Sequence, residues 1–399
     1  MNGLSSAPLA ILGASPRFSE PVHVGRPNIG DKAQFLKRIE DMLDRKWLTN
    51  AGPLVEEFET RIADDLDVKH CIAICNGTIA LEIAIRALRL TGEVIVPSWT
   101  FIATAHALAW QGITPVFADI DPKTHNLSPS AVRAAITPST SGIIGVHVWG
   151  RPAPIEELQA LANEHSLRLM FDSAHAYRCT HKGRRIGSFG ACEILSFHAT
   201  KVFNTLEGGA IVTNDDELAS RARLMRNFGF SGYDNVIHMG TNGKMIEASA
   251  AMGLTNLDML GHFVAINRER YDIYLDRLGR IPGVEMITYD SAEENNYHYI
   301  VASIDEPSRV SRDTLVKVLH AENILARKYF WPGCHGMQPY ASSVGVGALP
   351  HTDAVAARNI VLPSGPSLSN DDIHTICDVI EQACRRGVEL HESDVRSVT

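Results

Sequence analysis

The sequence has no excess of basic residues: among its 399 residues, 37 lysines and arginines stand against 46 aspartates and glutamates, for a net charge of −9. Proteins that bind nucleic acids usually carry a basic surface that neutralises phosphates, so we expect no DNA or RNA partner. No apolar run approaches the roughly 20 residues that a membrane-spanning helix needs, and the first residues contain no basic leader. These features predict a cytoplasmic protein without a membrane partner.

Paired cysteines and a phosphate-binding P-loop are missing too. The seven cysteines are scattered, and none forms a CxxC pair with a second ligand pair at zinc-site spacing, so we expect no metal. In residues 196–215, SFHATKVFNTLEGGAIVTND, the glycines follow the only lysine instead of preceding it. Nucleoside triphosphate binding is therefore not indicated.

Short apolar runs alternate with helical patterns between about residue 70 and residue 215. The alternation is typical of an α/β fold with a mostly parallel sheet flanked by helices. Ligands bind such sheets at the carboxyl ends of the strands, so functional residues should follow the apolar runs. The predicted strands span 70–75, 93–98, 114–120, 142–149, 167–172, 192–197 and 209–214, and two predicted helices span 78–90 and 155–166.

The pattern changes after about residue 260, and the chain is longer than one hydrophobic core usually supports. We predict a large domain over residues 1–260, beginning with an extended arm of about thirty residues, and a smaller α+β domain over residues 261–399. We expect the last dozen residues to be frayed. The second part should contain a charged helix at 266–280, a strand at 298–305, and helices at 311–324 and 370–387.

Several chemically distinctive residues follow the predicted strands. Gly77 and Thr78 open a helix whose N-terminal amides would favour a phosphate, although Thr78 could instead simply cap the helix. Trp99 offers a flat ring to a ligand, or is a core tryptophan. Asp172 follows a buried run, where a carboxylate needs a cationic partner or a structural hydrogen bond. His175 either faces the same pocket or packs against it.

Lys201 lies in an otherwise apolar segment. Desolvation lowers the pKa of a buried lysine and leaves a neutral amine that attacks carbonyl groups, which is Schiff-base chemistry. A phosphate cradle, a flat aromatic ring, a carboxylate that holds a cation and a nucleophilic lysine are what pyridoxal phosphate requires. The combination predicts pyridoxal 5'-phosphate as the cofactor.

Seven stretches carry a family resemblance: WLTNAGPLVEEFE, NGTIALEIAI, VPSWTFIATAHALAWQGITPVFADID, FDSAHA, SFHATK, GGAIVTND and GTNGKMIEASAAMGLTNLD. In the same order, they resemble the motifs of the DegT/StrS-type sugar-nucleotide aminotransferases. That resemblance implies the aspartate-aminotransferase fold (fold type I of the pyridoxal phosphate enzymes), L-glutamate as amino donor and a homodimer with shared active sites.

The resemblance also implies a role for each candidate residue. Lys201 is expected to form the imine with the cofactor, Asp172 to hold the pyridinium nitrogen and Trp99 to stack on the ring, with His175 also in contact with the cofactor. The residues expected to bind phosphate are Gly77, Thr78 and Ser196, and Asn242 is expected to reach the phosphate of the neighbouring subunit's cofactor.

Departures from the family pattern bear on which substrate is expected. Many members read SFxPTKNLG followed by GDGGA, whereas this sequence has His198 and Glu207 within SFHATKVFNTLEGGA. The variant resembles the subgroup that converts dTDP-4-keto-6-deoxyglucose to dTDP-4-amino-4,6-dideoxyglucose. In that subgroup the later motif reads YFYPGCHRMEPY, and here Gly336 and Gln338 replace its arginine and glutamate, which leaves the substrate open.

Three alternatives compete with this function. A related branch dehydrates the sugar instead, but that branch has histidine where this sequence has Lys201. A transaminase acting at C3 of a keto sugar, or on a cyclitol ketone, fits the same motifs. A regulatory protein that binds pyridoxal phosphate without turnover is the alternative outside the enzymes.

Overall fold

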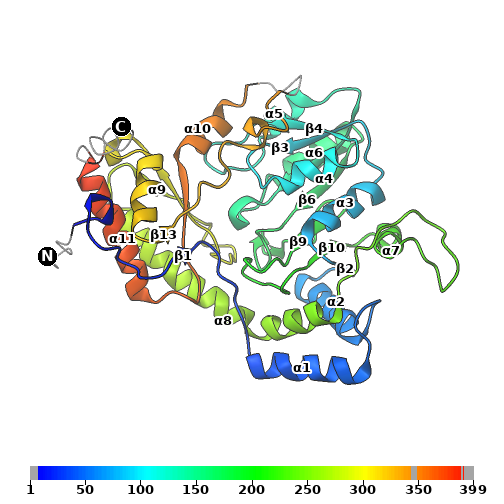
Figure 1. Cartoon of the computed structure of the whole chain (residues 1–399). Helices are drawn as coiled ribbons and strands as arrows, with labels where there is room; N and C mark the ends of the chain where they lie inside the picture. The colour runs from blue at the N-terminus through cyan, green and yellow to red at the C-terminus, as the bar shows by residue number, and fades with distance from the viewer. Residues whose placement is uncertain (1–7, 343–347, 388–389, 391–399) are drawn as a thin grey trace.

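A computed structural model of the chain describes residues 8–342, 348–387 and 390 (Figure 1). The expectation of a frayed C-terminus concerns residues that, apart from residue 390, lie outside this description.

A seven-stranded sheet lies at the centre of the larger part of the molecule. The strand order is β2-β10-β9-β6-β5-β3-β4; β10 runs antiparallel to both of its neighbours, and the remaining pairs are parallel. All seven predicted strands and the α/β class are confirmed. The strands are β2 (His70–Ile74), β3 (Glu93–Pro97), β4 (Thr114–Ala118), β5 (Thr140–Val146), β6 (Arg168–Asp172), β9 (Glu193–Ser196) and β10 (Gly209–Thr213).

Helices cover both faces of this sheet (Figure 1), which is why its strands are apolar along their whole length. Ile72 and Ile74 of β2 pack in the cluster that contains α3, whereas Cys71 and Ala73 pack in the cluster that contains α2. The predicted helices at 78–90 and 155–166 are confirmed as α3 and α6. The flanking helices are α2 (Pro53–Leu66), α3 (Gly77–Ala87), α4 (Ala103–Ala109), α5 (Pro129–Ala135), α6 (Ile155–Glu164) and α7 (Asp216–Met225).

The smaller part is built around a three-stranded antiparallel sheet of order β11-β12-β14. Its predicted strand and its helices α9 and α11 are confirmed. Its elements are β11 (Val284–Met286), β12 (Ile300–Ile304), α9 (Arg312–Ala321), β13 (Ile324–Leu325), α10 (Pro350–Arg358), β14 (Asn359–Leu362) and α11 (Asn370–Arg385). The remaining elements are short: η1 (Ala10–Leu12), η2 (Val148–Gly150), β7 (Thr180–His181), β8 (Arg184–Arg185), η3 (Glu306–Ser308) and η4 (Cys334–Gly336).

One helix, α8 (Glu247–Leu278), belongs to both parts. Its first half packs on α2 and its second half on α11, and Figure 1 shows it running between the two parts. The charged helix expected at 266–280 is thus the second half of a 32-residue helix. The domain boundary expected at residue 260 falls inside α8, and the division into two domains stays a prediction. No helix within the described ranges is long and apolar enough to span a membrane.

The N-terminal arm packs mainly on the smaller part of the molecule. Leu9 and Val22 are buried in the core of that part, and β1 (Val22–His23) pairs in parallel with β13. The arm then continues into α1 (Lys32–Arg45), which packs against α8. The arm is therefore held in place by its contacts.

Candidate active site

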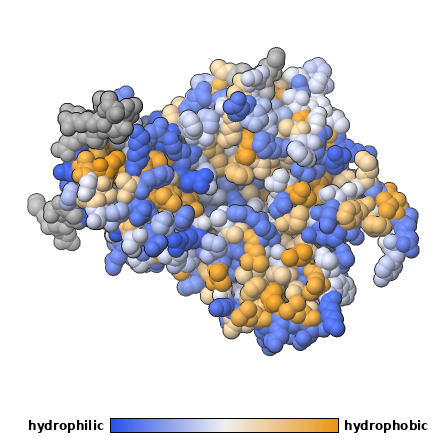
Figure 2. All heavy atoms as spheres, in the orientation of Figure 1, coloured by the Kyte–Doolittle hydropathy of each residue, from blue (hydrophilic) through white to orange (hydrophobic). Residues whose placement is uncertain are grey.

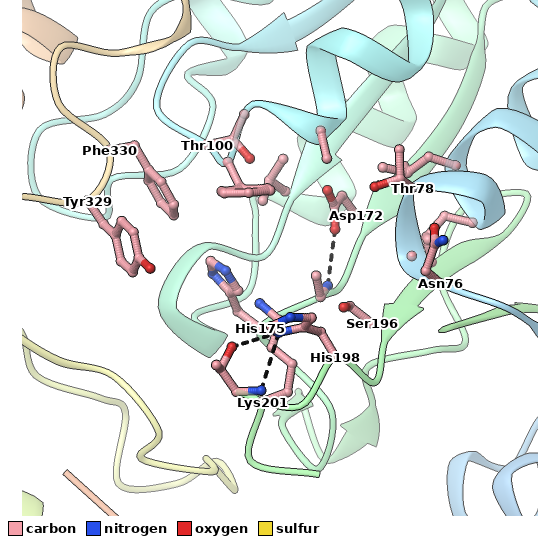
Figure 3. A pocket seen from close by; sticks show the side chains of 18 of the residues that line it. Asn76, Thr78, Thr100, Asp172, His175, Ser196, His198, Lys201, Tyr329 and Phe330 are labelled. Atoms are coloured by element: carbon pink, nitrogen blue, oxygen red, sulfur yellow. Dashed lines mark hydrogen bonds between the residues drawn. The ribbon is translucent and has the colours of Figure 1, made fainter. Parts of the chain in front are cut away.

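A cavity of about 510 Å³ opens at the carboxyl ends of the central strands. Its walls come from the turn after β2, the ends of β6 and β9, the segment after β3, and the smaller part of the molecule. Figure 3 shows Asn76 and Thr78 on one side of the cavity and Tyr329 and Phe330 on the other. Six of the eight predicted site residues line it: Gly77, Thr78, Asp172, His175, Ser196 and Lys201.

The start of α3 forms one end of the cavity. Asn76 caps this helix, because its side chain accepts a hydrogen bond from the amide of Ile79 at 2.9 Å. The alternative in which Thr78 is the cap is therefore wrong. A β-carbon on Gly77 would lie 3.1 Å from Cβ of Ser196. Only a glycine therefore lets the start of α3 come this close to the end of β9 without displacing either segment. The first amides of α3 and the Ser196 hydroxyl consequently face one small space, which suits a phosphate.

Asp172 is buried at the end of β6. Its carboxylate accepts hydrogen bonds from Thr104 Oγ1 at 2.8 Å and from the amide of Ala174 at 3.1 Å. Burial nevertheless raises the pKa of Asp172 above its ordinary value. Asp172 forms no ion pair with any side chain of the residues that the structure describes. The cationic partner that a buried carboxylate needs is therefore not one of those side chains.

A second layer of buried polar groups holds the end of β6 in place. The backbone amide of His147 donates to the carbonyl oxygen of Asp172 at 3.1 Å. The fully buried Glu193 accepts hydrogen bonds from the Ser173 hydroxyl and from two amides of the turn 187–189, and His147 Nε2 lies 3.4 Å from its carboxylate. These contacts fix the backbone on both sides of Asp172.

Lys201 lies in the short loop between β9 and β10, and its Nζ donates to the hydroxyl of Tyr299 at 3.2 Å. Burial lowers the pKa of Lys201 to about 8, although Asp172 and Tyr329 oppose that shift. At pH 7 about one such amine in ten is neutral, against fewer than about one in a thousand for an ordinary lysine. The environment therefore supplies the free amine that the sequence predicted.

His175 lines the cavity with a neutral, flat ring. Its Nδ1 accepts the backbone amide of Trp149 at 3.3 Å, and its ring lies nearly parallel to those of Trp149 and Phe330, at 5.8 and 5.9 Å. Burial, helped by the charges of Lys201 and His298, lowers the pKa of His175 well below its ordinary value. Of the two placements open for His175, the one in the cavity is confirmed.

The placement of Trp99 corrects a prediction. Trp99 is fully buried and packs edge-on against Trp149 and Phe330 in the core behind the cavity, so it has no free face for a cofactor. Two residues further on, Phe101 lines the cavity and is 55% exposed. The backbone turn after β3 sends the first ring inward and the second ring outward.

We therefore propose that Phe101, and not Trp99, stacks on the cofactor ring, and a mutational prediction follows. Phe101→Leu should weaken cofactor binding about tenfold, because a ring–ring stacking contact contributes about 0.5–1.5 kcal/mol beyond area burial and leucine lacks the flat face. Trp99→Phe is the matched control, and it should change the melting temperature more than the cofactor affinity. Equilibrium dialysis of pyridoxal phosphate measures the affinity. If only the Trp99 variant loses affinity, the assignment to Phe101 is wrong.

Asn242 lies outside the cavity. It is exposed and forms an isolated backbone bridge with Asn227, at the base of the loop 228–240 that follows α7. Figure 1 shows this loop extending away from the body of the molecule. The role predicted for Asn242, in a neighbouring subunit's site, stays a prediction.

His198 and Glu207 lie together at the cavity wall. His198 Nε2 is 3.2 Å from Glu207 Oε1, and the amide and hydroxyl of Thr200 contact the other ring nitrogen at 3.3 and 2.9 Å. The two residues that depart from the common family pattern thus form one pair, with His198 three residues before Lys201 and Glu207 six residues after it.

Sequence reasoning missed two contributors to the site, Thr104 and Tyr299. Thr104 falls within the VPSWTFIATAHALAWQGITPVFADID motif, in the first turn of α4, where its hydroxyl also contacts that of Thr100 at 3.2 Å. Tyr299 comes from the smaller part, 98 residues after Lys201, where no local pattern ties it to the strand ends.

A model of the DegT/DnrJ/EryC1/StrS aminotransferase family matches residues 30–381. This chain belongs to that family. It is 34% identical to the dTDP-4-amino-4,6-dideoxy-D-glucose transaminase of Shigella dysenteriae, over 92% of this chain and 100% of the relative. It is 31% identical to the GDP-perosamine synthase of Vibrio cholerae, over 86% and 95% of the two chains. The crystal structure of DesI in the presence of its TDP-sugar product superposes with a TM-score of 0.93 and 47% identity, over 96% and 98% of the chains.

DegT-family aminotransferases depend on pyridoxal phosphate, so the chain is a pyridoxal phosphate enzyme. Its residues fit that group on three counts. The start of α3 and Ser196 make a cradle that a side chain on Gly77 would crowd. Asp172 is a buried carboxylate without an ion-pair partner in the described part of the chain, and Lys201 has a weakly basic amine in the same cavity.

Proposed function

We propose that this aminotransferase converts dTDP-4-keto-6-deoxyglucose to dTDP-4-amino-4,6-dideoxyglucose, with L-glutamate as amino donor. The proposal rests above all on the buried, weakly basic amine of Lys201 in a cavity that also contains Asp172. The choice of sugar is supported by the transaminase from Shigella dysenteriae and by DesI, whose product is a TDP-sugar. The similarity to a GDP-perosamine synthase makes the base of the nucleotide the part to test.

We also propose how the residues divide the work. Bound pyridoxal phosphate supplies an aldehyde that exchanges amines and a ring that accepts electrons. Asp172 keeps a proton on the ring nitrogen, and Lys201 Nζ, neutral when free, takes a proton from the donor amino acid and returns one during amination of the sugar. Tyr299 orients this amine through its hydroxyl. The phosphate is bound by Gly77, Thr78 and Ser196.

A direct assay tests this function. The purified protein is supplied with glutamate and, in separate reactions, with dTDP-4-keto-6-deoxyglucose, its GDP counterpart, a 3-keto isomer and a cyclitol ketone. We expect 2-oxoglutarate and a dTDP-linked amino sugar in equal amounts in the first reaction, and much lower rates in the others. Faster turnover of the 3-keto sugar or of the cyclitol would overturn the proposed substrate. Failure of every ketone despite a bound chromophore would favour the non-catalytic alternative.

We further propose a homodimer that shares its active sites. Leu36 and Leu43 of α1 are 53% and 56% exposed, and Figure 2 shows hydrophobic side chains gathered over this helix. The loop 228–240 also carries exposed apolar side chains: Phe228, Phe230, Tyr233, Val236, Ile237 and Met239. Exposed apolar surface of this extent is typical of a subunit interface. In this dimer, Asn242 would contact the phosphate in the partner's site.

The dimer can be disrupted from α1. Leu36→Glu combined with Leu43→Glu should give a monomer, because it places two charges in an apolar contact. Analytical ultracentrifugation measures the oligomeric state. Trp110→Glu, at an exposed tryptophan after α4, is the control that should stay dimeric. Asn242→Ala should leave the dimer intact while weakening cofactor binding. A double glutamate variant that sediments as the native protein does would refute this interface.

A cytoplasmic location completes the proposal. All seven cysteines are free thiols, and six of them are buried. Free thiols are usual in the reducing cytoplasm, whereas oxidising compartments favour disulfides. Cell fractionation tests this location.

A further inference from the structure

A second cavity, of about 370 Å³, adjoins the first. Phe101, Tyr329 and Phe330 line both cavities, so these rings lie between the two. The outer wall of the second cavity is the segment 326–331, which leads from β13 to the turn before η4. We call this second cavity the outer groove.

The outer groove presents an exposed aromatic face. The side chain of Trp331 is 52% exposed and lines the groove. A large ring left half in water, in a concave surface beside an active-site cavity, is typical of a ligand contact. The planar partners that stack best on such a ring include nucleobases.

The groove also contains a cation without a counter-charge. The guanidinium of Arg327 is exposed and lies 4.7 Å from the centre of the Tyr329 ring, and within residues 8–342 and 348–387 its side chain forms no ion pair or hydrogen bond. Its neighbour Lys328, in contrast, is paired with Asp313 at 2.8 Å and lies 5.2 Å from the Trp331 ring. Arg327 is therefore the residue free to bind an anion, and a guanidinium binds phosphate oxygens in a bidentate manner.

We propose that the outer groove binds the nucleoside diphosphate of the substrate, with Arg327 on the diphosphate and Trp331 on the base. This inference rests on the proposed function, since it places the sugar beyond Tyr329 in the first cavity, toward Lys201. A stacking ring and a free guanidinium recognise the part of the substrate that every nucleotide sugar shares. The other residues of the segment 326–331 then hold the Arg327 and Trp331 side chains in place at the entrance to the active site.

Binding of dTDP, which lacks the sugar, tests the groove directly. Isothermal titration of the holoenzyme measures the Kd of dTDP for the native protein, Arg327→Met and Trp331→Ala. Each substitution should raise the Kd at least tenfold. Thymidine should lose affinity only in the Trp331 variant, and inorganic phosphate should bind far more weakly than dTDP. Arg168→Met, at an exposed arginine at the opposite end of β6, is the matched control and should bind dTDP as the native protein does.

The outcomes separate this inference from the proposed function. If both groove variants bind dTDP with the native Kd, the groove assignment is wrong, whatever sugar the enzyme aminates. If the variants lose dTDP while the native enzyme fails to aminate dTDP-4-keto-6-deoxyglucose, the groove stands and the proposed substrate falls. In an active enzyme, the Arg327 variant should raise KM for the sugar nucleotide at least tenfold and change kcat by less than threefold. A lowered kcat at unchanged KM would contradict a binding role.

Discussion

Lys201→Ala should lower the rate of transamination about 10²–10⁴-fold, because it removes the group that we propose moves the proton, and such groups contribute about that much. The fold should survive, since the change deletes a buried amine whose charged form burial already disfavours. Release of 2-oxoglutarate from glutamate measures the rate, and circular dichroism checks the fold. Lys69→Ala, at an exposed lysine beside Asp216, is the matched control and should keep the native rate.

Two further measurements distinguish a missing base from a damaged site. Small amines added to the Lys201→Ala protein should restore part of the rate, and more so at a pH above the pKa of the amine. Lys201→Arg should remain inactive, because a guanidinium stays protonated and cannot accept a proton. A Lys201→Ala protein that turns over at the native rate would remove the basis of the proposed mechanism.

Asp172→Asn should lower the rate about 10²-fold or more. An amide cannot balance the charge of a protonated ring nitrogen, and breaking a buried ion pair costs about 3–5 kcal/mol. Thr104→Val removes only one hydrogen bond to the same carboxylate, so its effect should be about tenfold. Steady-state rates with saturating glutamate and sugar provide the comparison. An Asp172→Asn enzyme within threefold of the native rate would contradict the role assigned to this carboxylate.

Stability adds a second readout for Asp172. Burial raises its pKa, so in the cofactor-free chain the charged carboxyl costs free energy of folding. This cost grows as the pH rises from the unfolded pKa to the raised folded pKa, and it stays constant above that. Asparagine removes the charge. The cofactor-free Asp172→Asn protein should therefore melt at the same or a higher temperature at pH 7, and the difference should vanish at low pH. A structural role alone would instead lower the melting temperature.

The central sheet could be predicted well from the sequence, because the strands of this sheet are buried on both faces and therefore appear in the sequence as continuous apolar runs. Asp172 and Ser196 were found for the same reason, since each is the polar residue that ends such a run. Trp99 and Phe101 show the limit of this reasoning. Both are aromatic residues just after β3, and only the three-dimensional path of the turn decides which ring faces the cavity.

Contacts between distant segments lay beyond prediction. The sequence placed an arm at the N-terminus, but the pairing of β1 with β13 joins residues 302 positions apart, as Val22 with Ile324. Tyr299 approaches Lys201 in the same way, through the packing of one part of the molecule on the other. Such contacts depend on the shapes of two assembled surfaces, and single-segment periodicity carries no information on them.

The uninterrupted course of α8 limits how this enzyme can move. A helix of 32 residues is a stiff rod about 48 Å long, and it is embedded in the larger part at one end and in the smaller part at the other. The N-terminal arm forms a second tether, because β1 is held by the smaller part and α1 by α8. Swinging the two parts wide apart would require breaking this double connection. We therefore expect substrates to enter and leave through the mouth of the cavity, with adjustments on the scale of side chains and short loops.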